Sequence, residues 1–134
     1  RLAPNAQITA IAMGRAEYTD LQEAARALAT FLKPLPTQPL IVISSDMNHF
    51  AEDRENRRRD QLALEQLAAL DPSGLLKTCK EENISMCGQI PAAFVLLTLQ
   101  YMQCTCNYQK IAYATSAEAT GDISSVVGYA GVVF

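Results

Sequence analysis

Residues 91–102 form the segment that most restricts the fold of this chain. They read PAAFVLLTLQYM, and in a helix their apolar side chains would fall on nearly every side. Such a helix has to be covered all round by other elements, so it belongs in the core of a folded domain. It falls well short of the ~20 apolar residues that a membrane-spanning helix needs. The chain has 134 residues, which is enough for one domain with a substantial core.

The order of the remaining segments predicts an α/β fold. Strand-type runs are predicted at 7–13 and 40–44, helices at 19–32, near 54–70 and from residue 72, and final strand-type runs at 108–116 and 124–134. LIVIS at 40–44 is apolar throughout, as is typical of a central parallel strand that is buried on both faces. Thr19 or Asp20 is expected to cap the first helix, and Asp71 with Pro72 predicts the start of the third. Strands and helices alternate at first, and the last two strands are close enough in sequence to pair directly.

The charge balance argues against a nucleic-acid-binding surface. The net charge is −3 and the pI is about 5.1. The basic cluster 57–59 lies within the segment 51–60, whose four arginines face four acidic residues. This pattern is typical of a solvated helix face that is stabilised by acid–base pairs at i,i+4 spacing.

The cysteines predict thiols in a reducing compartment. None of the four has CxxC spacing, and the one close pair, Cys104 and Cys106, would form a strained bridge. As a zinc site this pair lacks a nearby partner, so ordinary half-buried cysteines are the favoured interpretation. The first ten residues, RLAPNAQITA, have no long apolar core of the signal-peptide kind. We therefore expect a cytoplasmic protein without a membrane partner.

Three reactive residues lie at the ends of predicted elements. Asp46 and His49 follow a strand, and Cys87 precedes a helix. The stretch SSDMNHF after the strand at 40–44 presents Asp46 and the only histidine of the chain, His49. In open α/β sheets, ligands bind beyond the carboxyl ends of the strands. Cys87 stands before Gly88 at the expected start of the core helix, where a helix N-terminus favours the thiolate. Together these side chains form a candidate reactive site.

Each of these residues also has a structural interpretation. A lone histidine after a strand is more often a structural or surface residue, and Asp46 can cap a loop or the following helix. Cys87 can be a small buried side chain. Ser44 and Ser45 lack the flanking glycines of a nucleophile elbow, so serine hydrolysis is disfavoured.

Three motifs give the chain a resemblance to a known family. IVISSDMNHF, MCGQIPAAFVLL and the ending YATSAEATGDISSVVGYAGVVF occur in that order, and together they resemble the carboxyl-terminal half of the Memo-like family. Its bacterial and archaeal members are called AmmeMemoRadiSam system protein B. The family is similar in fold to class III extradiol dioxygenases. The resemblance therefore implies a three-layer α/β/α architecture with a mixed, mostly parallel sheet, of which residues 1–134 would form a single carboxyl-terminal portion.

The resemblance also implies roles for the three candidate residues. Cys87 stands where the family places a cysteine metal ligand, and His49 stands where the related dioxygenases keep an acid–base histidine. Asp46 matches the family's aspartate beside that histidine. In one place the chain departs from the family: Ala117 and Glu118 follow Ser116 where the family reads Ser-Gly-Asp. A role for that loop is therefore not carried over.

The number of available ligands predicts an incomplete metal site. A transition-metal site needs about three protein ligands, and this chain owns one histidine. In the family the other metal-binding histidines lie in an amino-terminal half that has no counterpart here, so we interpret the chain as a fragment. The expected cofactor is iron, with copper as the alternative, and the further ligands would come from that half. The expected partner is the amino-terminal half of the same protein or a second copy.

Two classes of function follow from this interpretation. The first is a metal-dependent oxidoreductase of the dioxygenase-like kind, in which His49 moves protons. The second is a non-catalytic module that binds a peptide, a small molecule or a partner protein in the same cleft. A third interpretation, a metal-free hydrolase built on Cys87, His49 and Asp46, fits the residue types but has no supporting motif.

Overall fold

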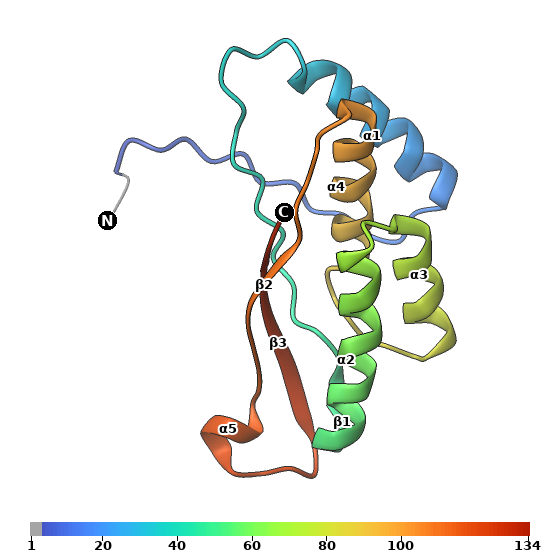
Figure 1. The fold of residues 1–134 in the computed structure, drawn as a ribbon, viewed down its shortest axis with the longest axis vertical. Coiled ribbons are helices and arrows are strands. Elements are labelled where there is room, and N and C mark those ends of the chain that lie inside the picture. Colours follow the sequence, from blue (N-terminus) through green and yellow to red (C-terminus); the bar gives the residue numbers. More distant parts are fainter. Residues whose placement is uncertain (1–3) are drawn as a thin grey trace.

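The chain folds as a layer of helices against a small antiparallel sheet (Figure 1). The computed structural model describes residues 4–134. The elements are α1 (Tyr18–Leu32), β1 (His49–Ala51), α2 (Asp53–Ala68), α3 (Pro72–Glu81), α4 (Gln89–Met102), β2 (Gln109–Thr115), α5 (Ala117–Thr120) and β3 (Val126–Val133). The predicted α/β class is confirmed.

The sheet has the strand order β1-β3-β2. β2 and β3 form a long antiparallel ladder in which Gln109 lies opposite Val133 and Thr115 opposite Gly128. On the other edge of β3, the short strand β1 also runs antiparallel. Both ladders among residues 4–134 are thus antiparallel, and the expected parallel pairings and third layer stay predictions.

Helix α4 lies at the centre of the core, as its apolar sequence predicts. On one side Ala92 and Leu96 belong to a cluster with α2 and α3, against which Tyr113 and Val132 of the sheet also pack. On the other side Phe94, Val95 and Leu97 pack against α1. A helix that is enclosed from two sides needs apolar residues all round, which explains the composition of this segment. Within the described part of the chain, no helix is long and apolar enough to cross a membrane.

The helix starts were predicted with mixed success. Asp71 caps α3 as expected: its Oδ1 accepts a hydrogen bond from the backbone N–H of Gly74 at 2.9 Å, and Pro72 is the first helical residue. For α1 the prediction is wrong, because Glu17 occupies the N-cap in place of Thr19 or Asp20. The Glu17 side chain makes no capping hydrogen bond.

Two predicted strands are absent from the described structure. Residues 7–13 and 40–44 belong to no ladder among residues 4–134, and their apolar side chains lie largely in solvent. Leu40 is 89% exposed and Val42 76% exposed, so the expected burial of 40–44 on both faces is wrong for this structure. An apolar run becomes a strand only where a neighbouring backbone supplies hydrogen bonds, and residues 4–134 supply none to these runs.

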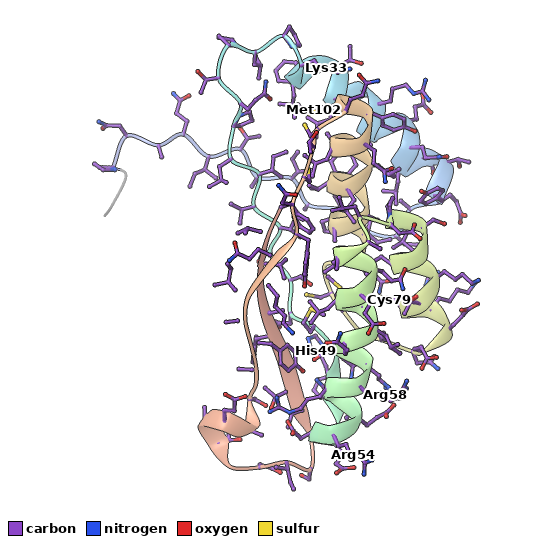
Figure 2. All side chains as sticks on the ribbon, viewed as in Figure 1. Lys33, His49, Arg54, Arg58, Cys79 and Met102 are labelled. Atoms are coloured by element: carbon purple, nitrogen blue, oxygen red, sulfur yellow. The ribbon has the colours of Figure 1, made fainter. Side chains whose placement is uncertain are left out.

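The face of the hairpin that points away from the helices is apolar and open. All the longer helices lie to one side of β2 and β3 (Figure 1), and side chains fill the space between them (Figure 2). Along β3 the residues Ala130 and Val132 pack toward the core, whereas Tyr129 and Val133 alternate with them and are exposed. An antiparallel sheet that faces water normally carries polar residues on that face. The open face of β3 therefore has the apolar composition that is usual for a sheet face covered by other polypeptide.

The α3 cap gives a test of the fold. Asp71→Ala removes the acceptor for the Gly74 N–H and should lower the free energy of unfolding by about 1 kcal/mol, measured by urea denaturation. Glu17→Ala is the matched control, since it removes an acidic N-cap residue that makes no side-chain bond. Equal losses in both variants would show that helix-terminal charge, and not the capping bond, stabilises α3.

Candidate functional site

The segment that carries the candidate site is anchored to β3. The Met47 N–H donates to the Gly128 carbonyl at 2.9 Å, and the Gly128 N–H donates back to the Asn48 carbonyl at 2.9 Å. Strand β1 then begins at His49. The histidine therefore opens a strand, whereas the sequence predicted that it follows one.

The same segment contacts the start of α4. The Asp46 N–H donates to Cys87 Sγ at 3.2 Å, and Ser45 Oγ lies 3.7 Å from the same sulfur. Ser45 Oγ also accepts a hydrogen bond from the Gly88 N–H at 2.8 Å. A Cβ at Gly88 would overlap the Ser45 side chain, so glycine is required for this close approach. The thiol of Cys87 is thus held beside Asp46, directly before the N-terminus of the core helix, as predicted.

His49 lies on the other side of Asp46. Its Nε2 is 3.5 Å from Asp46 Oδ2, and the imidazole is 20% exposed while the carboxylate is 49% exposed. This separation is short enough for an ion pair, but the geometry is not that of a hydrogen bond. Nε2 is buried and has no hydrogen-bond partner in the described structure. A buried imidazole nitrogen without a partner is unusual in a folded protein, and it marks His49 as a candidate functional residue.

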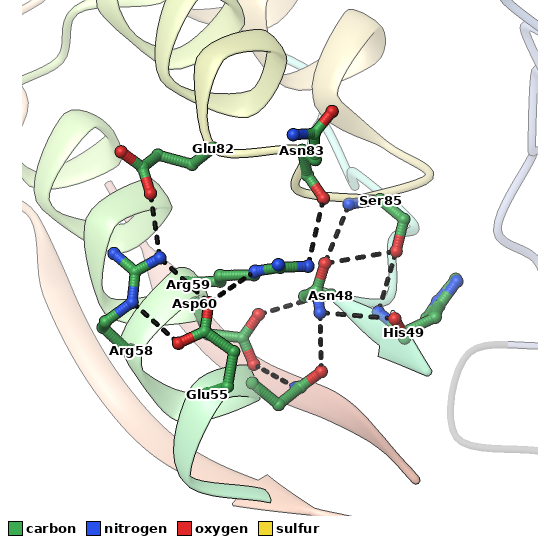
Figure 3. A network of polar contacts seen from close by, with 10 residues as sticks. Asn48, His49, Glu55, Arg58, Arg59, Asp60, Glu82, Asn83 and Ser85 are labelled. Carbon is green, nitrogen blue, oxygen red and sulfur yellow. Dashed lines mark hydrogen bonds and ion pairs between the residues drawn. The ribbon is translucent and has the colours of Figure 1, made fainter. Parts of the chain in front are cut away.

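A second connection joins the two segments of the site (Figure 3). The backbone N–H of His49 donates to Ser85 Oγ at 2.8 Å. The backbone N–H of Ser85 donates to Asn48 Oδ1 at 3.0 Å, and Ser85 Oγ lies 3.3 Å from the same oxygen. Residues 45–49 and 85–88 are therefore tied at both ends, and the distance between His49 and Cys87 is fixed by the protein itself.

Asp60 of α2 holds the backbone of Asn48, next to His49, in place. Its carboxylate accepts hydrogen bonds from the Asn48 N–H at 2.7 Å, from Asn56 Nδ2 at 3.0 Å and from the Tyr113 hydroxyl at 2.6 Å. Burial raises the pKa of Asp60, although these donors act in the opposite direction. The pKa of Tyr113 is also raised, by burial first and then by the hydrogen bond to Asp60. Gly128 packs directly on the carboxylate.

The structure separates the other sequence candidates from this site. Glu118, at the departure from the family pattern, lies on α5 and pairs with Arg57 at 3.3 Å. Cys104 and Cys106 lie in the connection after α4, and all four cysteines are free thiols. Among the described residues no group of three or more His, Cys, Asp and Glu side chains is placed to hold a metal ion.

Sequence reasoning missed the residues that hold the site. Asn48, Asp60 and Ser85 are ordinary polar residues in the sequence, and nothing in their spacing predicts that they meet. Asn48 alone carried a signal, because it stands between Asp46 and His49 in the sequence.

The fold and the site define an α/β protein in which the Cys87 thiol contacts the backbone of Asp46 and the His49 imidazole lies beside the Asp46 carboxylate, between a strand start and a helix N-terminus. Residues 1–133 match the family model described as Memo-like protein, and the chain belongs to this family. The family inferred from the motifs is confirmed. The carboxyl-terminal position within the family fold and the similarity to extradiol dioxygenases stay predictions.

Several relatives carry the same family name. The chain is 33% identical to a MEMO1 family protein of Aquifex aeolicus over 118 residues, which cover 88% of this chain and 43% of the relative. It is 34% identical to one of Thermotoga maritima over 112 residues, covering 84% and 38%. A third, from Methanopyrus kandleri, is 28% identical over 124 residues, covering 92% and 44%. The chain spans less than half the length of these relatives.

The contact between Gly128 of β3 and Asp60 gives a test of how this contact stabilises the protein beside the site. Gly128→Ala places a methyl group on the Asp60 carboxylate and should cost about 1–3 kcal/mol of stability in denaturant unfolding. Gly131→Ala is the matched control in the same strand, because its new methyl would meet only Ile111 Cβ, at 3.9 Å. The control should change stability by no more than about 0.5 kcal/mol. Similar losses would mean that strand propensity, and not the carboxylate contact, limits β3.

Proposed function

We propose that this chain supplies one side of a metal-dependent redox centre: Cys87 as a thiolate ligand, and His49 with Asp46 as an acid–base pair. The observation that carries the proposal is that Asp46 contacts both residues: its backbone N–H contacts Cys87 Sγ, and its carboxylate lies beside His49 Nε2, which is buried and has no hydrogen-bond partner among the described residues. The family membership supports it, since the motif residues of the resemblance are the ones that meet.

The residues fit such a group in part. A thiolate ligand suits iron and copper better than hard cations, and the buried Nε2 of His49, which has no partner among the described residues, is available for proton transfer. Because about three protein ligands are needed, the remaining ligands have to come from polypeptide outside residues 1–134. We take iron as the metal, with copper as the alternative, and a reducing compartment such as the cytoplasm as the location that keeps Cys87 a free thiol.

The chain's own residues would act as follows. The metal, when bound, supplies redox and Lewis-acid chemistry. The Asp46 N–H, at 3.2 Å from Cys87 Sγ, stabilises negative charge on the sulfur and fixes its direction. His49 takes up or releases a proton at Nε2, and the Asp46 carboxylate stabilises the imidazolium that forms. The step to a dioxygenase-like reaction is proposed by analogy of fold alone.

Metal analysis tests this proposal. The complete protein that contains this chain, purified without oxygen, should hold iron or copper, and Cys87→Ser should weaken the affinity by about tenfold or more because a direct ligand is lost. Cys104→Ser is the matched control, since that thiol is also exposed but lies outside the site. The isolated 134-residue chain should bind the same metal only weakly.

Two results would contradict the proposal. Unchanged affinity in Cys87→Ser would remove Cys87 from the ligand set. A complete protein that holds no metal would leave the second class of function, a binding module that uses the same cleft.

We further propose that the open face of β3 is covered by polypeptide outside residues 1–134. The exposed apolar residues on it and around it support this: Tyr129, Val133, Ile111, Leu40 and Val42. Exposed apolar patches of several hundred Å² are uncommon on soluble monomers and mark contact surfaces.

Light scattering on the isolated chain tests this cover. The 134-residue chain should self-associate and bind a dye for apolar surfaces, whereas the complete protein should bind little dye. The double variant Tyr129→Thr with Val133→Thr places residues of high strand propensity at both positions and should reduce dye binding. A monodisperse isolated chain without dye binding would show that the core closes by itself. A defined dimer of the isolated chain would make a second copy the cover.

A further inference from the structure

Phe50 has a backbone conformation that no neighbouring helix end explains. Among the described residues four non-glycine residues have positive φ: Phe50 at 63°, Leu70 at 53°, Asn83 at 51° and Gln103 at 62°. The last three lie within two residues of the ends of α2, α3 and α4, where a left-handed residue commonly ends a helix. Phe50 alone lies inside a strand, and a bulky residue is rarely found in this conformation.

The left-handed residue forms a bulge beside the candidate site. His49 lies opposite Val127 and Ala51 opposite Val126, so Phe50 is one extra residue in β1. Bulges with a left-handed residue usually place glycine there, and they are common next to active sites, where they redirect a side chain. The bulge at Phe50 directly follows His49 and therefore affects the direction of the His49 side chain.

Phenylalanine lowers stability here in two ways. The left-handed conformation is strained for any residue with a Cβ. In addition, the Phe50 side chain is 82% exposed, so burial of its ring offsets almost none of that strain. Glycine or asparagine would fit the bulge with less strain, which indicates that the ring itself has a role.

The ring of Phe50 contacts His49. The two ring centroids are 5.6 Å apart and the planes are inclined by 65°, which is an edge-to-face arrangement. His49 thus has three specific contacts: Ser85 Oγ accepts from its backbone N–H, the Asp46 carboxylate lies near Nε2, and the Phe50 ring lies edge-to-face with the imidazole. Of these three, Phe50 is the one that makes an aromatic contact with the imidazole.

We propose that Phe50 is a positioning residue that holds the His49 imidazole with Nε2 shielded from water and directed at Asp46. The left-handed bulge is retained because it brings the Phe50 ring against the imidazole. This role rests on the proposed function, since a fixed and shielded Nε2 matters where that nitrogen moves protons.

The test separates the strain from the ring. Phe50→Gly and Phe50→Asn fit the bulge without the ring, and Phe50→Tyr keeps the ring. Each variant of the complete protein is measured for its melting temperature and for the rate at which diethyl pyrocarbonate acylates His49, read by mass spectrometry of the peptide that contains residue 49. His49→Gln confirms the assignment of the label.

We expect Phe50→Gly and Phe50→Asn to melt no lower than the wild type, because strain is relieved. Both should react with the reagent severalfold faster at His49, because Nε2 loses its shield. Phe50→Tyr should keep the wild-type rate. Gln103→Gly is the matched control for strain: it relieves a left-handed residue far along the chain, so it should raise the melting temperature without changing the rate at His49.

Opposite outcomes would overturn the inference. A lower melting temperature in both Phe50→Gly and Phe50→Asn with an unchanged rate at His49 would make Phe50 a structural residue. An unchanged rate at higher stability would remove its role at the imidazole. Both measurements can be made on the metal-free protein, so a complete protein without iron or copper would refute the proposed redox centre while leaving the result on Phe50 readable.

Discussion

Asn48 has no exposed surface and uses every polar group of its side chain within the protein. Its Nδ2 donates to Asn56 Oδ1 at 2.7 Å and its Oδ1 accepts from the Ser85 N–H at 3.0 Å. Its backbone N–H meanwhile donates to Asp60. Helix α2, the loop before α4 and the first residue of β1 are therefore joined through one residue. Replacing it would leave several buried groups unpaired, each costing about 1–3 kcal/mol. The positions of His49 and Cys87 depend on these bonds.

The core and the site are stabilised by different kinds of interaction. The packing of α4 between α1 and the other helices comes from apolar burial, which is non-directional and tolerates substitutions of similar volume. The contacts around Asn48 and Asp60 are directional, and each donor has a particular acceptor. Apolar burial thus determines that the chain folds, while the hydrogen bonds determine how far the thiol lies from the imidazole. Because buried polar networks lose more when one member is removed, the site should be more sensitive to substitution than the core.

The sequence predicted the elements that depend on local pattern and missed those that depend on distant partners. The helices follow from apolar periodicity, and α3 follows from Asp71 and Pro72. The final hairpin follows from two apolar runs with a short connection. Residues 40–44 have the composition of a strand, but pairing depends on a neighbouring backbone that residues 4–134 do not provide. For the site, the reactive residues were predicted from motif and resemblance, and their convergence on Asp46 was seen only in the structure. Phe50 was missed because no pattern of residue types reveals a left-handed backbone.

The site and the open face differ in what they require from outside the chain. The distance between Cys87 and His49 is fixed by contacts that all lie within residues 45–128, namely those of Ser45, Asn48, Asp60, Ser85 and Gly128. The shape of this half of the site therefore does not depend on further polypeptide. The open face is the opposite case, because Tyr129 and Val133 gain burial only from a surface that these residues do not form. At the site, the strained backbone of Phe50 can persist because the surrounding hydrogen bonds fix its conformation. In the proposed redox centre, the polypeptide that supplies the remaining ligands therefore meets Cys87 and His49 in positions that this chain has already fixed.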